Sequence, residues 1–157
     1  MRWLAYALAT VYHETGTRME PVREGFCETD ACSIRAVKSL FDRGIIARNY
    51  ALPHPNGNSY FGRGLVQLTH GVNYEKIGKH LGMGMQLYNN PSLALNLGIS
   101  VNILFKGMVD GKFTDFSFKD FFTRTTTDWI NARKIVNWLD KANLIADYGK
   151  NFLKCLQ

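Results

Sequence analysis

Residues 3–15 read WLAYALATVYHET, and this stretch decides how the rest of the chain can fold. Between Trp3 and Tyr12 only Thr10 is polar, so the run is too short to cross a bilayer and too uniformly apolar for a surface helix. We therefore predict a helix that is buried on most sides and that other helices pack around. Gly16 follows the stretch and is the residue type expected just beyond a helix C-terminus.

Glu14 lies at the end of this predicted helix and continues its apolar face. At about 100° per residue, one stripe of the helix carries Trp3, Ala7, Val11 and Glu14. Partial burial and the negative end of the helix dipole both favour the protonated carboxyl over the anion, and a general acid must be protonated. From the helix alone, a solvated glutamate or one paired with Arg18 or Arg23 remains an alternative.

Length and composition indicate an ordinary globular protein. The chain has 157 residues with 46% hydrophobic and 13% aromatic content, which is enough for a real core and excludes a disordered chain. We expect a single domain over residues 1–157. The net charge of +6 and the pI near 9.3 suit an anionic partner such as nucleic acid, a membrane surface or an acidic wall polymer, although such a charge also serves solubility alone. The absence of a Lys/Arg-rich cluster argues against nucleic acid.

The three cysteines, Cys27, Cys32 and Cys155, are too few and too widely spaced for a disulfide scaffold. Cys27 and Cys32 are close enough to form a small loop under oxidation. A C-x4-C spacing without a second pair is poor for zinc, so we predict no metal. The N-terminal apolar run is too short for a signal peptide, and we expect it to be the first helix of the fold rather than an export or membrane segment.

Periodicity and capping signals predict further helices over residues 33–42, 72–81, 92–108 and 128–139, and a last one after Asp140. Ser33, Thr127 and Asp140 are the expected N-caps of three of them. Residues 17–33 and 49–59 are predicted loops because of their Pro, Gly and Asn content. The five phenylalanines between 113 and 122 are more typical of core packing than of a sugar platform. Strand signals are few, so we predict an all-α, or mostly α, fold.

Residues 60–69, YFGRGLVQLT, place Gly62 and Gly64 on either side of Arg63. This spacing lets a backbone turn tightly or approach another group closely. A dinucleotide-binding loop would need a third glycine where Gln67 stands, which excludes such a cofactor site. Spacing alone indicates a tight turn beneath the core.

Taken together, three stretches resemble glycoside hydrolase family 19, which holds plant-type chitinases and a large set of phage endolysins. The stretches are Tyr12-His13-Glu14-Thr15, residues 60–69 followed by Asn73-Tyr74, and the weaker block ARKIVN at 132–137. Each is modest alone, but their order and separation are specific. The resemblance implies a lysozyme-like fold with two helical lobes flanking a substrate cleft.

By resemblance, Glu14 is the general acid that protonates the leaving glycosidic oxygen. The family inverts configuration, so a second carboxylate must activate water from the opposite face, with the two carboxyl groups about 6.5–9.5 Å apart. Glu24 in the following loop is our candidate for this base. Glu20, Glu28 and Asp30 remain open as alternatives.

The resemblance also gives roles to polar residues of the second and third stretches. Thr69 is expected to hold the attacking water together with the base. Gln67 lines the cleft, and substrate contacts are expected from Tyr60, Asn73 and Asn137.

Two arginines complete the expected site. Arg63 is either a buried ion-pair partner that orders the cleft or a sugar contact, and the flanking glycines favour the first. Arg133 is expected to pair with Glu14 and tune it. The implied chemistry needs no metal or organic cofactor.

The expected function is that of a monomeric bacteriolytic endolysin that hydrolyses β-1,4 bonds of peptidoglycan glycan strands, helped toward an anionic wall by its positive charge. Less chain than usual in the family precedes the acid-bearing helix, so the chain is either a minimal version or truncated at its start. The cysteines do not reproduce the paired disulfides of plant enzymes, and this favours the phage-type branch. That branch implies synthesis in the host cytoplasm and release to the wall, in the periplasm, after a holin opens the membrane. The alternatives are a chitinase acting on chitin or chitooligosaccharides, and a non-catalytic wall-binding module, against which the presence of Glu14 argues.

Overall fold

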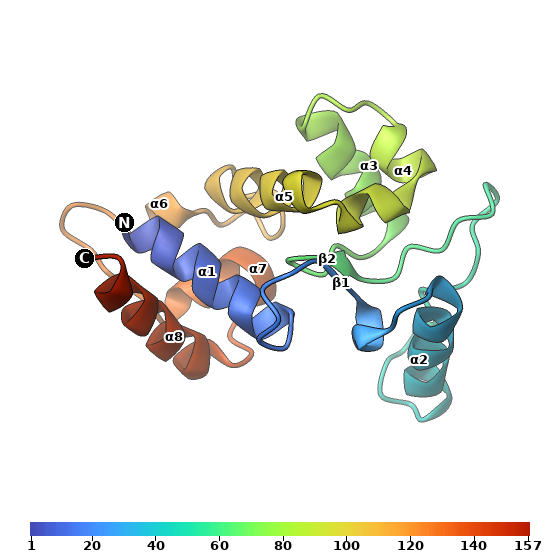
Figure 1. Cartoon of the computed structure of the whole chain (residues 1–157), viewed down its shortest axis with the longest axis horizontal. Helices are drawn as coiled ribbons and strands as arrows, with labels where there is room; N and C mark the ends of the chain where they lie inside the picture. The colour runs from blue at the N-terminus through green and yellow to red at the C-terminus, as the bar shows by residue number, and fades with distance from the viewer. The chain divides into compact units, whose positions relative to one another are not determined.

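The computed structural model describes all 157 residues and is mostly helical (Figure 1). Its α-helices are α1 (Arg2–Glu14), α2 (Asp30–Asp42), α3 (Gly71–His80), α4 (Gln86–Asn89), α5 (Leu97–Val109), α6 (Phe118–Phe121), α7 (Lys134–Asn137) and α8 (Ala142–Cys155). Short 3-10 helices are η1 (Glu24–Phe26), η2 (Pro91–Leu95) and η3 (Asn131–Arg133). The one sheet is a pair of antiparallel two-residue strands, β1 (Val22–Arg23) and β2 (Arg63–Gly64). The mostly α fold class is confirmed.

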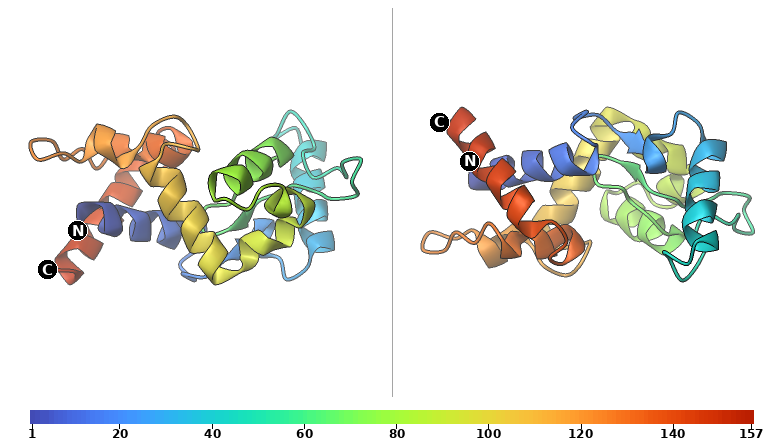
Figure 2. Two further views of the ribbon diagram at one scale, coloured as in Figure 1. Left: turned by 90° about the horizontal axis from the view of Figure 1, so that it is seen from above. Right: turned by 90° about the horizontal axis from the view of Figure 1, so that it is seen from below.

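The chain divides into two compact units. Unit 1 consists of residues 1–19 and 102–157, and unit 2 of residues 20–101. In unit 1, α1 packs most extensively against α8, and the two helices lie side by side in Figure 1. In unit 2, α3 packs against α4, as both views in Figure 2 show. No helix of either unit combines the length and the apolar character needed to span a bilayer.

Helix α1 is the buried helix that its sequence predicts. Its buried residues are Ala5, Tyr6, Ala7, Ala9, Thr10 and Val11. Gly149 of α8 gives Trp129 and Tyr6 room to pack, since a Cβ there would lie 2.8 Å from the Trp129 ring and 3.5 Å from the Tyr6 ring. Gly16 follows the helix with a φ of +56°, as expected for a residue that ends a helix.

The phenylalanine-rich segment of unit 1 packs into the core. Phe118, Phe121 and Phe122 are buried, and Trp3 of α1 stacks on Phe118 with ring centroids 5.3 Å apart. Phe122 in turn contacts Trp129 edge to face at 5.0 Å. The preference for core packing over a sugar platform is therefore confirmed for these three side chains.

The predicted helix over residues 128–139 is wrong, and so are two of the predicted caps. Instead of a long helix capped by Thr127, the structure has η3 and α7, and the Asp128 carboxylate accepts the Asn131 N–H at 2.9 Å. This local bond lets Asp128 start the turn in place of Thr127. After α7 the chain reverses at Trp138, whose φ is +39°, and α8 begins after Lys141 with φ +55° rather than after an Asp140 cap.

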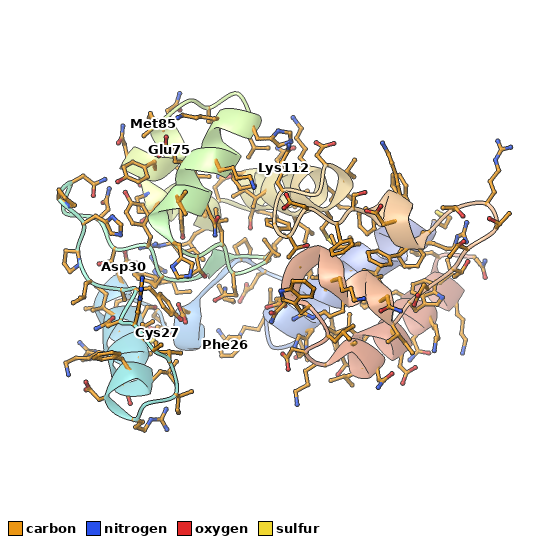
Figure 3. The ribbon with its side chains drawn as sticks, turned by 180° about the vertical axis from the view of Figure 1, so that it is seen from behind. Phe26, Cys27, Asp30, Glu75, Met85 and Lys112 are labelled. Atoms are coloured by element: carbon orange, nitrogen blue, oxygen red, sulfur yellow. A yellow bond between two sulfur atoms is a disulfide. The ribbon has the colours of Figure 1, made fainter.

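In unit 2, α2 begins three residues earlier than predicted. Thr29, not Ser33, is its N-cap, and the Thr29 hydroxyl accepts the Cys32 N–H at 3.3 Å. Ser33 is buried inside the helix and donates its hydroxyl to the Glu24 carbonyl at 2.9 Å. A disulfide joins Cys27 to Cys32 across the helix start, so these two cysteines form the small loop that their spacing suggests. Figure 3 labels Cys27 just ahead of α2 and Asp30 at its first turn.

The predicted helix over residues 92–108 is interrupted. Pro91 opens η2, and α5 starts only at Leu97, because Asn96 adopts an extended conformation and its side-chain oxygen accepts the Ile99 N–H at 3.1 Å. An asparagine at that position competes with the backbone ladder and restarts the helix. The predicted helix at 72–81 is confirmed, within one residue at each end, by α3.

Candidate functional site

In unit 1, Glu14 is the last residue of α1 and is held by a buried arginine. Its Oε1 lies 2.8 Å from Nη1 of Arg133, and the two side chains are 16% and 1% exposed. Arg133 comes from η3, and its Nε donates to the Asp140 carbonyl at 2.9 Å. A guanidinium fixed on one side by a carbonyl and on the other by Glu14 orients the carboxylate. The pairing expected between Arg133 and Glu14 is present.

Asn137 belongs to the same unit as Glu14. It is the last residue of α7, about one helical turn beyond Arg133. Its side chain is exposed, and an exposed amide offers both donors and an acceptor. This is the chemistry that its predicted substrate contact requires.

In unit 2, both carboxylate oxygens of Glu24 are held by donors far along the chain. Glu24 begins η1 directly after β1. Its Oε2 accepts the Gly62 N–H at 2.7 Å, and its Oε1 accepts the Tyr50 hydroxyl. The Glu24 N–H also donates to the Gly62 carbonyl at 2.8 Å, which continues the pairing of β1 with β2. The half-buried carboxylate is therefore oriented by its own backbone and by two hydrogen bonds.

The other acidic candidates for the base have different surroundings. Glu20 and Glu28 are exposed. Asp30 bridges two arginines, Arg23 at 2.7 Å and Arg63 at 3.0 Å. Burial acts to raise the pKa of Asp30, but the hydrogen bonds and positive charges of these arginines outweigh it and lower the pKa below its usual value. Asp30 thus has the environment of a structural ion pair, and the geometry favours Glu24 as the base.

Tyr50 is the site residue that sequence analysis missed. Burial, followed by the hydrogen bond and the charge of Glu24, raises the pKa of the Tyr50 hydroxyl well above its ordinary value. The hydroxyl therefore stays protonated and donates to Glu24 at any pH at which the protein would work. The Pro- and Asn-rich composition around Tyr50 identified a loop, but no local signal links it to a carboxylate 26 residues away.

Residues 60–69, here called the second signature, place Gln67 beside Glu24, and this packing accounts for the glycine at 62. A Cβ on Gly62 would lie 2.7 Å from the Gln67 Oε1 and 3.3 Å from the Glu24 Oε2. The amide nitrogen of Gln67 is occupied, since it donates to the Val22 carbonyl at 3.0 Å and to the Gly64 carbonyl at 3.2 Å. A larger residue at 62 would therefore force the Gln67 side chain to move away from its present position beside Glu24.

Thr69 and Asn73 extend this arrangement into α3. The Thr69 hydroxyl donates to the Gln67 carbonyl at 2.8 Å, and the Asn73 amide donates to the Thr69 carbonyl at 2.8 Å. Both side chains are half-buried. Because its proton points to a carbonyl, the Thr69 oxygen is free to accept a hydrogen bond from a water molecule.

Tyr60 lies in the core of unit 2. It has no exposed surface, its hydroxyl donates to the Tyr88 carbonyl at 2.9 Å, and its ring stacks on Tyr88 at 4.9 Å. Asn56 donates to the same hydroxyl at 2.7 Å. In this position Tyr60 supports the start of the signature, and its side chain has no face left for a substrate.

Arg63 is also buried, with 1% of its surface exposed. Besides the ion pair with Asp30, its Nη1 donates to the Ser59 carbonyl at 3.0 Å, and its guanidinium lies 3.6 Å from the centre of the Phe61 ring. Tyr74 receives another Arg63 hydrogen bond at 3.2 Å, and burial raises the pKa of Tyr74 to about 12. These contacts agree with the interpretation of Arg63 as a buried ion-pair partner.

No group of three or more His, Cys, Asp and Glu side chains is arranged to hold a metal ion. In unit 2, the Glu24 carboxylate and the Gln67 amide oxygen lie beside Gly62, and the Thr69 hydroxyl bonds the backbone carbonyl of Gln67. Such a set can bind and polarise a water molecule and hydrogen-bond a neutral polar ligand.

Comparison with known proteins gives a family match over most of the chain. The model of glycoside hydrolase family 19, described as chitinase class I, matches residues 2–119, which is 118 of the 157 residues. Two relatives are an acidic 26 kDa endochitinase of Solanum lycopersicum and the acidic endochitinase pcht28 of Solanum chilense. Each is 56% identical over 34 residues, a segment that covers 22% of this chain and 13% of the relative.

Proposed function

The chain belongs to glycoside hydrolase family 19, the class I chitinases, and we propose that it hydrolyses the β-1,4 glycosidic bonds of bacterial peptidoglycan. The proposal rests on one observation: the Glu24 carboxylate accepts hydrogen bonds from the Tyr50 hydroxyl and from the N–H of Gly62, which lies in the second signature. A second positioned carboxyl, Glu14 on Arg133, supplies the acid that the reaction needs.

In this mechanism Glu14 gives its proton to the glycosidic oxygen as the bond from that oxygen to the anomeric carbon breaks. Glu24 takes a proton from a water molecule, and the water oxygen forms the new bond to the anomeric carbon from the opposite face. Thr69 accepts a hydrogen bond from the same water and keeps it aligned. The sugar product has inverted configuration, and the two carboxyl groups end with their protonation states exchanged.

Amide side chains supply the expected substrate contacts. The Gln67 oxygen stands beside Gly62 and Glu24, while Asn73 in unit 2 and Asn137 in unit 1 carry amides suited to the acetamido and hydroxyl groups of the sugars. The proposed reaction needs no metal or organic cofactor.

Charge and redox chemistry support a bacterial wall as the target. The chain has a net charge of +6 and a pI near 9.3, whereas the two Solanum relatives named above are called acidic endochitinases. A positive enzyme is steered toward an anionic wall polymer. The Cys27–Cys32 disulfide suits an oxidising compartment such as the periplasm. We therefore propose a monomeric, phage-type endolysin, made in the host cytoplasm and released to the wall through a holin.

Chitin is the second candidate substrate, because both relatives are endochitinases. The same acid and base serve either polymer, since both carry β-1,4-linked N-acetylated sugars. The deciding assay measures new reducing ends from purified peptidoglycan and from chitooligosaccharides. Release from peptidoglycan supports the endolysin, and release from chitooligosaccharides alone supports the chitinase. Wall binding with no reducing ends from either polymer identifies a non-catalytic binding module.

The base is tested on whichever polymer is cleaved. Glu24→Gln keeps the shape of the side chain but removes the base, and the rate should fall by about 10²- to 10⁴-fold. Glu28→Gln is the matched control, because Glu28 is exposed and lies in the same loop region. Proton NMR of the first products should show the inverted anomer. Equal loss of rate in both variants, or none in either, contradicts the assignment of Glu24.

A further inference from the structure

Unit 2 contains a pocket that none of the roles above uses. It has a volume of about 520 Å³ and lies along the C-terminal half of α2 and the loop that follows. Its lining includes Lys38, Phe41, Asp42, Arg48, Asn49 and Leu52.

The pocket combines open apolar walls with an uncompensated positive charge. Phe41 is 43% exposed and Leu52 is 60% exposed, so two large apolar side chains remain in contact with water. Because both side chains line one concave surface, they can cover apolar groups of a ligand. Lys38 is neutralised by Asp42 at 2.6 Å, whereas Arg48 is exposed and has no ion-pair partner. The pocket is therefore suited to a ligand that has small apolar groups and a carboxylate.

The pocket and the predicted base are connected through one loop. Asn49 lines the pocket, and the next residue, Tyr50, donates to Glu24. The Asn49 side-chain oxygen accepts the Ala51 N–H at 3.1 Å, which fixes the bend of the loop. Ala51 is fully buried in a core cluster with Val37 of α2 and Phe61 of the signature. The loop is thus anchored on both sides, and the pocket has a fixed position relative to Glu24 within the unit.

We propose that this pocket binds the peptide arm of peptidoglycan. The inference rests on the proposed function and names the part of the substrate that chitin lacks. The arm is a short peptide with alanine methyl groups and free carboxylates, which match the apolar walls formed by Phe41 and Leu52 and the charge of Arg48. An extended arm of four residues spans about 14 Å. In this proposal the arm leaves a sugar near Glu24 and continues past Tyr50 and Asn49, the residues that connect Glu24 with the pocket.

The first test is calorimetric binding of two probes to the full chain: a disaccharide bearing a tetrapeptide arm, and the same disaccharide without the arm. The arm should tighten binding to the wild type by about tenfold or more, which corresponds to about 1.4 kcal/mol. Arg48→Glu and Leu52→Ser should each remove this difference. Arg35→Glu is a matched control with the same charge change on exposed α2 surface, and Ile45→Ser matches Leu52 because both side chains are 60% exposed. Both controls should keep the difference.

The second test measures new reducing ends from soluble, uncrosslinked glycan strands, with their arms intact or removed by an amidase. The wild type should have a lower KM for the strands with arms, and Arg48→Glu should bring the ratio of the two KM values toward one. The inference is overturned if the wild type has equal KM values for strands with and without arms and equal affinities for the two disaccharide probes. This outcome leaves the proposed function in place. If neither kind of strand is cleaved, the proposed function fails, and the binding difference between the two probes still decides the inference.

Discussion

Tyr50→Phe removes a single hydroxyl and leaves the ring, so it isolates what that hydroxyl does for Glu24. The hydroxyl donates to Glu24 Oε1, while the Gly62 N–H donates to Oε2 at 2.7 Å and remains in the variant. Glu24 then keeps one of its two donors and gains freedom to rotate away from the attacking water.

A hydrogen bond to a charged group contributes about 1.5–3 kcal/mol. Because the Gly62 contact remains, we take the lower end, and about 1.5 kcal/mol in the transition state corresponds to a roughly tenfold lower kcat. KM should change less than about twofold, since Tyr50 touches Glu24 and not the bound sugar in the proposed mechanism. The melting temperature should fall by only about 2–4 °C for a loss of about 1 kcal/mol in a chain of this size.

The assay is the rate of reducing-end release over a range of substrate concentrations, for a double-mutant cycle of Tyr50→Phe and Glu24→Gln. If Tyr50 acts through Glu24, adding Tyr50→Phe to Glu24→Gln should have almost no further effect on kcat. Tyr148→Phe makes the same chemical change on α8, outside unit 2, and should leave kcat unchanged. Additive losses in the double variant, or a rise in KM without a fall in kcat, would refute the positioning role of Tyr50.

Three further perturbations follow from the same contacts. Arg133→Met leaves Glu14 without its buried partner, so the free energy of unfolding in urea should fall by about 3 kcal/mol. An unchanged urea midpoint would mean that the ion pair does not stabilise the fold. Gly62→Ala places a Cβ 2.7 Å from the Gln67 oxygen and should lower kcat about tenfold with little change in melting temperature. If the variant keeps the kcat of the wild type, the packing around Gly62 does not matter for the reaction. The two arginines hold the pKa of Asp30 below its ordinary value in the folded state, so its ion pairs stabilise the protein fully above about pH 4 and progressively less as the pH falls through the folded pKa. Urea midpoints of the wild type and Asp30→Asn from pH 6 to pH 3 should therefore converge at the acidic end, and a constant gap would contradict the pairing.

Helices with a strong local signal could be predicted from the sequence. The apolar run in α1, which only Thr10 interrupts, and the periodic pattern of α3 both predict a helix, and both helices have nearly the predicted bounds. Three of the errors occur where a short polar side chain bonds the backbone. Thr29, Asn96 and Asp128 each accept a nearby N–H and move a helix start, and sequence alone does not show which of several adjacent Ser, Thr, Asn and Asp residues will do so.

Most residues of the candidate site could be predicted from the sequence, but the hydrogen bonds and packing contacts between them could not. The resemblance of the motifs predicts Glu14, Gln67 and Thr69 as site residues, and the glycines that flank Arg63 favour its burial, which the structure shows. The contact of Tyr50 with Glu24 depends on how a loop folds back over η1. Neither the hydrophobic periodicity of the sequence nor a capping residue indicates this path of the loop. The burial of aromatic residues such as Tyr60 is likewise set by tertiary packing, so a motif position alone does not separate a substrate contact from its support.

The most direct test of the central proposal compares the wild type with Glu14→Gln on outer-membrane-permeabilised bacteria and on purified peptidoglycan. The proposal predicts that the wild type lyses the cells and releases new reducing ends, and that the variant loses both activities by about 10²-fold or more. A variant that keeps both activities would show that Glu14 is not the general acid. A wild type that binds the wall but releases no reducing ends would contradict the assignment of this chain as a peptidoglycan hydrolase.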